Sequence, residues 1–205
     1  DLSYTILPKP HIIIKNVKFF TNDRESPKEL AQIKKLKVFI SQKNFFDKKN
    51  LEIKKISFDQ SNFLIQQQDL KYLKKFIEEK FSEKKININN SNFFYNDNEN
   101  KVISIFPVSN IDLFYDDQNN QNFLISKGEL FTMPYTLTWS RNLYKNLNFL
   151  SLKNKKLNIK IENLTEEKES HLLIKNVIFF RNTEIQTDIQ AKKESIEISS
   201  IKDSR

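Results

Sequence analysis

Alternation of apolar and polar residues dominates the sequence. The clearest runs contain Leu36, Val38 and Ile40; Ile111, Leu113 and Tyr115; and Leu157, Ile159 and Ile161. A period of two places one side of a β-strand in apolar surroundings and the other side in water. Asn- and Asp-rich breaks at 96–100 and 116–122 separate such runs. Since Asn and Asp tolerate the left-handed backbone region, they can form hairpin turns without glycine. The pattern therefore predicts a mainly β protein with antiparallel strands.

One segment has helical spacing instead. It follows Asp69, a residue type that favours helix N-caps, and Lys and Glu fill the positions between its apolar residues. These apolar residues are Leu70, Leu73, Ile77 and Phe81. The sequence therefore predicts one amphipathic helix near 69–84.

Two distant segments repeat each other. The stretch from His11 to Asn22 aligns with the stretch from His171 to Asn182, and eight of the twelve positions are identical. A reused strand element explains this better than chance. The separation of 160 residues is too long for an ordinary solenoid repeat.

The composition limits how thick a core the chain can build. Hydrophobic residues make up 38% of the 205 residues, below the roughly 45–50% of an ordinary globular domain. The 18 Phe are nevertheless far too many for a disordered chain. We therefore expect an extended, curved antiparallel sheet, a half-pipe or taco-like groove, whose apolar face stays open. The alternative is a closed β-sandwich, in which a second sheet covers that face.

The inventory of reactive residues argues against an enzyme. A single Gly excludes the glycine-rich phosphate loops, and the lack of Cys excludes thiolate metal sites and Cys nucleophiles. His11 and His171 each open a predicted strand, with no nearby cluster of potential metal ligands. Asp116 and Asp117 are interpreted as solvated turn residues. We expect no catalytic residue, no metal and no cofactor.

The positive charge has an ordinary explanation. The formal net charge is +8, but only four of the 34 basic residues are Arg, and the Lys residues are interleaved with acids. Nucleic-acid binders rely on Arg for bidentate contacts. We therefore interpret the charge as solvated strand faces, predict no nucleic-acid partner, and keep nucleic-acid binding as the weakest alternative. Weak attraction to an anionic membrane surface is compatible with this composition.

Several segments resemble the N-terminal region of AsmA-like proteins. The first is Pro8–Phe20, and Ile33–Ser41 with Phe45-Phe46 follows it. Leu51–Phe58 then leads to Phe63–Ile65 and the predicted helix. Further strand units are Asn92–Tyr95, Ile111–Leu113 and Gly128–Trp139. The likeness lies in apolar spacing and in Pro and Asn positions, and it spans most of the chain. Asn and Ser occupy most positions where the family has Gly.

The resemblance implies a function and a location. It implies that 1–205 is a single β-groove region of a longer chain, with a membrane anchor upstream. The location would be the periplasm, anchored to the inner membrane, and the groove would carry phospholipid acyl chains between the inner and outer membranes. No catalytic residue is implied. The candidate groove residues are Ile103, Ile105, Ile111, Leu113, Leu157, Ile159, Ile161, Ile174 and Ile189. The alternative is a non-enzymatic envelope scaffold that assists assembly of outer-membrane proteins and binds protein partners at a sheet edge.

Overall fold

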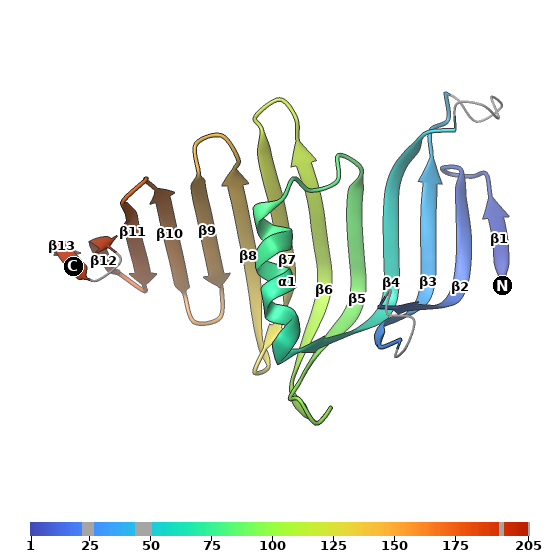
Figure 1. Cartoon of the computed structure of the whole chain (residues 1–205), viewed down its shortest axis with the longest axis horizontal. Helices are drawn as coiled ribbons and strands as arrows, with labels where there is room; N and C mark the ends of the chain where they lie inside the picture. Colours follow the sequence, from blue (N-terminus) through green and yellow to red (C-terminus); the bar gives the residue numbers. More distant parts are fainter. Residues whose placement is uncertain (22–26, 44–50, 193–194, 205) are drawn as a thin grey trace. The chain divides into compact units, whose positions relative to one another are not determined.

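The chain divides into two compact units. The computed structural model describes residues 1–21, 27–43, 51–192 and 195–204 (Figure 1). The N-terminal unit is Asp1–Phe114 and the C-terminal unit is Tyr115–Arg205. The sequence predicts one region over 1–205, and the structure divides this region into the two units. Phe45 and Phe46, which belong to the resemblance, lie outside the described residues.

The strands of the N-terminal unit follow the order of the chain. They are β1 (Leu2–Thr5), β2 (His11–Phe20), β3 (Glu29–Ile40), β4 (Ile53–Gln66), β5 (Lys85–Asn96) and β6 (Val102–Asp116). The pair β4–β5 is parallel, whereas the other neighbours from β1 to β6 are antiparallel. Parallel neighbours need a long crossover connection. The 3₁₀ turn η1 (Gln67–Asp69) and the helix α1 (Leu70–Glu78) lie in this connection (Figure 1).

The C-terminal unit is a series of antiparallel hairpins. Its strands are β7 (Gln121–Leu130), β8 (Met133–Asn142), β9 (Leu147–Asn154), β10 (Ile159–Glu167), β11 (His171–Phe180), β12 (Thr183–Lys192) and β13 (Ile196–Ser204). The prediction of a mainly β chain with an open antiparallel sheet and one helix is confirmed. Among its described residues, neither unit contains the second sheet that a closed sandwich would require.

Asparagine takes the place of glycine in four of the turns, as the sequence predicts, whereas Phe131, Thr132 and Arg181 have positive φ in two others. Asn100, Asn120, Asn146 and Asn158 have positive φ values of 63°, 52°, 49° and 51°, and no Gly has a positive φ. Each of the four lies in a turn or bend between successive strands. The short side chain of Asn makes the left-handed region accessible at lower cost than other non-glycine residues allow.

The helix is shorter than predicted. It begins after Asp69, as expected, but it ends at Glu78 rather than near Lys84. The Asp69 side chain accepts a hydrogen bond from the Gln66 backbone N–H at 2.8 Å, so it caps the preceding 3₁₀ turn. Phe81 lies beyond the helix, where it is buried and its ring stacks on that of Phe76 at 4.7 Å. Phe81 is therefore apolar because it packs in the connection between β4 and β5, and not because it belongs to the helix.

A line of left-handed residues crosses the N-terminal sheet. Asn16 in β2, Gln60 in β4 and Asn90 in β5 have φ values of 55°, 55° and 47° inside their strands. The registers place Asn16 opposite Lys34 of β3, and Asn90 opposite Ser109 of β6. We call this line, Asn16–Lys34–Gln60–Asn90–Ser109, the crease. Such residues act like β-bulges, which locally break the regular alternation of a strand.

The crease reverses the alternation of side chains between the two faces. In an unbroken strand, residues 58 and 63 would point to opposite sides. The rings of Phe58 and Phe63 instead approach each other at a centroid distance of 6.4 Å, so both lie on one face. Phe63 stacks on Phe93 of β5 at 4.7 Å, and Phe58 pairs with Ile88 of the same strand. The apolar face thus continues across the crease although its residues change from even to odd numbers.

Candidate functional site: an uncovered apolar sheet face

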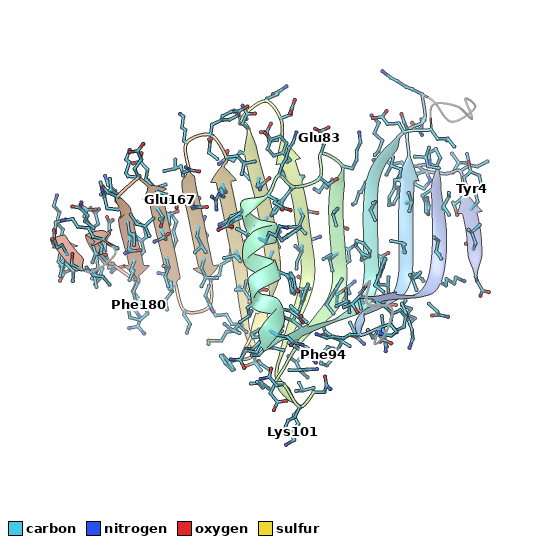
Figure 2. All side chains as sticks on the ribbon, viewed as in Figure 1. Tyr4, Glu83, Phe94, Lys101, Glu167 and Phe180 are labelled. Carbon is cyan, nitrogen blue, oxygen red and sulfur yellow. The ribbon has the colours of Figure 1, made fainter. Side chains whose placement is uncertain are left out.

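The strands of the C-terminal unit share one apolar face. One row of paired residues runs across them from Leu137 through Leu152, Ile161 and Ile178 to Ile185. Other residues that point to the same side of each strand extend this face. They include Trp139, Leu150, Ile159, Phe180, Ile174, Ile189 and Ile198. We call this surface the apolar face of the C-terminal unit, and Phe180 marks the end of β11 on it (Figure 2).

Charged residues are confined to the margin of this face. From β7 to β13 its strand positions carry only Arg141, Glu167 and Asp203, each the last or second-to-last residue of its strand. The opposite face carries charged side chains along the strands, including the ion pair between Lys160 Nζ and Glu162 Oε1 at 3.0 Å. The interior of the apolar face therefore offers no charge that an apolar ligand would have to desolvate.

The apolar face is not packed shut by the unit's own side chains. Among the described residues after Tyr115, no hydrophobic side chain is buried. The buried residues are Asn122 and Ser126, at β7 positions of this face, and Ser140 and Ser151 on the opposite face. Ile178 is 37% exposed, Ile185 is 39% exposed and Ile198 is 61% exposed. A contiguous exposed apolar surface of this kind is characteristic of a partner or ligand site.

A polar row crosses the apolar face. The side-chain amide of Asn163 donates to Asn176 Oδ1 at 2.7 Å, and the Asn176 amide donates to Thr187 Oγ1 at 3.1 Å. Thr165 donates its hydroxyl to Asn163 Oδ1 at 2.9 Å. These groups form hydrogen bonds with one another across β10, β11 and β12. The row therefore makes the face less apolar, but it leaves few polar groups without a hydrogen-bonding partner.

The nine candidate groove residues do not share one surface. Ile159, Ile161, Ile174 and Ile189 lie together on the apolar face of the C-terminal unit, on β10, β11 and β12. Leu157 lies in the turn before β10 and is 42% exposed, so its predicted strand position is wrong. Leu157 and Ile159 follow the alternating pattern in the sequence. They do not lie in one strand, because the left-handed Asn158 turns the backbone between them.

The four candidates on β6 are divided by the crease. Ile111 pairs with Ile88 and Leu113 pairs with Ile86, so both lie on the apolar face of the N-terminal unit. Ile103 and Ile105 precede the crease and lie on the opposite face, where they are 60% and 52% exposed. The expectation that all four point into one groove fails for this pair, because regular alternation does not continue through Ser109.

The other face of the N-terminal unit carries a polar network that the sequence analysis missed. Asn89 donates to Asp59 Oδ1 at 2.7 Å, Ser57 donates to the same oxygen at 2.8 Å, and Lys37 forms an ion pair with Asp59. Burial disfavours the charged carboxylate, but the hydrogen bonds from Asn89, Lys37 and Ser57 outweigh it, and the pKa of Asp59 lies below its ordinary value. The network extends through Asn87 to Asp112, at 2.8 Å.

The residues considered for chemistry contact near neighbours in the chain. His11 Nδ1 lies 2.8 Å from the Lys9 carbonyl, and His171 Nδ1 lies 3.0 Å from Ser170 Oγ. The Asp116 carboxylate accepts the Asn119 side-chain amide at 2.7 Å at the β6–β7 turn. Within the described ranges, no group of three or more His, Asp or Glu residues is placed to hold a metal ion.

Two comparisons with known proteins found no match. No protein-family model and no curated protein sequence matches the chain. The AsmA-like resemblance therefore stays a prediction from the sequence. In the part of the chain that the structure describes, no helix has the length and apolarity needed to cross a membrane.

Proposed function

We propose that this protein binds lipid acyl chains on the apolar face of the C-terminal unit. One observation carries the proposal: from β8 to β13 an apolar face without charge in its interior has no second layer within its own unit, and no described hydrophobic side chain after Tyr115 is buried. An acyl chain would supply the apolar cover that the unit lacks. The site performs no chemistry in this proposal.

The energetics favour an acyl chain as the cover. Each methylene withdrawn from water contributes about 0.8 kcal/mol, so a 16-carbon chain contributes on the order of 12 kcal/mol when it is fully buried. A single open face covers one side of the chain only and gains a fraction of this. Because Ile178 and Ile185 are also partly exposed, ligand and protein both lose apolar surface to water on binding.

Lipid movement within a cell envelope extends the proposal. The resemblance to AsmA-like proteins supplies the periplasmic location, the membrane anchor outside this chain and the transfer of phospholipids. These remain predictions that depend on the resemblance. Acyl-chain binding depends on the apolar face alone.

The test compares two neighbouring residues of β11 that point to opposite faces. Ile178 lies on the apolar face and Val177 on the charged face, where it pairs with Glu162. We expect Ile178→Asn to reduce binding of a fluorescent fatty acid about tenfold and Val177→Asn to leave it nearly unchanged, because only the first change removes contact area for the chain. Native mass spectrometry of the purified protein should show bound lipid that Ile178→Asn depletes. Equal losses in both variants, or no lipid bound to the unmodified protein, would refute the proposal.

A scaffold that adds a partner's strand is the second candidate. β13 is the last of the described strands, and its Ile196, Ile198 and Ile201 are 75%, 61% and 66% exposed. An exposed, apolar edge strand is a template for pairing with another chain. Photocrosslinkers at Lys202 of β13 and at Ile161 distinguish the candidates: protein adducts at β13 alone favour the scaffold, and lipid adducts at Ile161 favour acyl-chain binding.

A further inference from the structure

The N-terminal unit has a basic cleft at the start of β2, the end of β3 and the start of β4. It has a volume of about 450 Å³. Four of its lining side chains are lysines, and an aromatic ring and a proline contribute apolar surface. These six residues are Lys9, Lys43, Lys54, Lys55, Phe39 and Pro10. No acidic side chain lines the cleft, so its walls favour a negatively charged occupant.

Among the described residues, carboxylates neutralise only part of this positive charge. Lys54 Nζ lies 3.0 Å from Glu52 Oε1, and Lys84 shares the same carboxylate at 3.3 Å. The hydrogen bonds from Lys54 and Lys84 hold the pKa of Glu52 below its ordinary value, so Glu52 keeps its charge for these two partners. Among the described residues, no carboxylate forms an ion pair with the other three lining lysines.

Backbone and ring contacts fix the walls. The Ile40 N–H donates to the Pro10 carbonyl at 3.0 Å, and the Ser41 N–H donates to the Glu52 carbonyl at 2.9 Å. The ring of Phe39 stacks on His11 at a centroid distance of 4.9 Å. These contacts tie together the segments before β2, after β3 and before β4. The cleft is therefore formed before a ligand arrives, which reduces the ordering cost of binding.

We propose that this cleft binds the phosphate group of an anionic lipid headgroup, and this inference rests on the proposed lipid binding. Lysines that lack carboxylate partners give charge-assisted hydrogen bonds to phosphate oxygens. Phe39 and Pro10 add apolar surface for the glycerol end of a lipid. Phe39 pairs with His11 and with Lys55 on the face of the N-terminal unit opposite Val38, so the cleft lies at the strand ends on that face.

The experiment compares two triple variants with equal loss of charge. K9Q/K43Q/K55Q removes the three lysines of the cleft, and K15Q/K34Q/K35Q removes three exposed lysines of β2 and β3 outside it. The probes are a short-chain phosphatidylglycerol, the corresponding phosphatidylcholine, glycerophosphoglycerol and inorganic phosphate. We expect the cleft variant to weaken phosphatidylglycerol binding about tenfold and the control variant less than about twofold. Equal weakening by both variants, or none by the cleft variant, would overturn the assignment.

The probes also identify the source of the phosphate. Phosphatidylglycerol that binds much more tightly than glycerophosphoglycerol or inorganic phosphate supports a lipid headgroup. Equal affinities, lost in the cleft variant, support a site for free phosphate esters and overturn the headgroup assignment. Ile178→Asn should leave glycerophosphoglycerol binding unchanged. If only the cleft assignment is wrong, Ile178→Asn still weakens binding of the fatty acid. If the proposed function is wrong, Ile178→Asn has no such effect.

Discussion

β2 and β11 have nearly the same sequence but different backbones. In β2, Asn16 adopts a left-handed conformation with a φ of 55°. At the aligned position of β11, Asn176 continues the strand, and its side chain contacts Asn163 and Thr187 in the polar row. As a result, Val17 lies on the apolar face of its unit, whereas the aligned Val177 lies on the charged face of the other.

The difference shows that neighbouring strands select the conformation of this Asn. β2 lies in a sheet where β4 and β5 also have left-handed residues at the same level, and their apolar residues change parity there too. β11 lies between regular strands that offer hydrogen-bonding partners on the same face. An Asn between Lys and Val is compatible with the left-handed and with the extended conformation. The neighbouring strands determine which of the two it adopts.

The two units also differ in burial. The N-terminal unit buries Ile33, Ile88, Val108 and Ile111, with Ile33 only 2% exposed. The C-terminal unit buries no hydrophobic side chain among its described residues after Tyr115. We infer that the N-terminal unit provides most of the stability and the C-terminal unit most of the binding surface.

The largest expected effect tests this division of roles. Ile33→Ala should destabilise the N-terminal unit by about 2–5 kcal/mol, because it leaves a cavity at a fully packed position. Ile178→Ala should cost below about 1 kcal/mol, since that side chain is already partly in water. Amide hydrogen exchange in β3 and β11 measures both. Fluorescence of Trp139, the single tryptophan, follows the C-terminal unit in urea. Equal costs at the two positions would contradict the division.

The next effect tests the two Asn conformations. We expect the order of stability of the alanine and glycine variants to be opposite at positions 16 and 176. At position 16, alanine should cost about 1–2 kcal/mol and glycine less, because alanine is strained at positive φ. At position 176, glycine should be less stable than alanine by about 0.5–1 kcal/mol, as expected in a regular strand. Chemical denaturation of the four single variants gives the two differences. The same rank at both positions would show that the backbones do not differ.

A smaller effect concerns pH. The pKa of Asp59 is lowered in the folded protein, so the stabilisation it provides is complete above the ordinary carboxyl pKa of about 3.9 and is lost as the pH falls through its folded value. Asp59→Asn should therefore flatten the acid dependence of unfolding below about pH 4 in the N-terminal unit and leave the C-terminal unit unchanged. Unfolding monitored by hydrogen exchange at several acidic pH values checks this. An unchanged slope in the variant would rule out the contribution of Asp59.

The smallest expected effect concerns the polar row. Thr187→Val removes the acceptor for the Asn176 amide while keeping the side-chain shape. Because these groups are only partly buried, water can replace the lost bond, and the cost should stay below about 1 kcal/mol. The added methyl group should strengthen fatty-acid binding slightly. A titration of Thr187→Val beside the unmodified protein measures the change, and weaker binding would indicate that the polar row itself contacts the ligand.

Local patterns predicted the strand content, the Asn turns and the start of the helix, because each depends on nearby residues. The face of Ile103 and Ile105 could not be predicted by regular alternation, since the crease depends on partners in other strands. A signal for it was nevertheless present: the apolar residues change parity along five strands, as in Ile14 and Val17. The basic cleft joins segments that are close only after β2, β3 and β4 pair. The lysine count alone therefore did not reveal it.

Successive pairing within each unit has a consequence for how the molecule is made. Apart from the β4–β5 crossover, nearly every contact joins segments adjacent in the chain, so little loop entropy is lost at each step. Each hairpin can attach to the one already formed, and the sheet can lengthen strand by strand. A gene encoding such a ribbon can gain or lose a hairpin by a short insertion or deletion, which adjusts its reach in steps of about 10 Å.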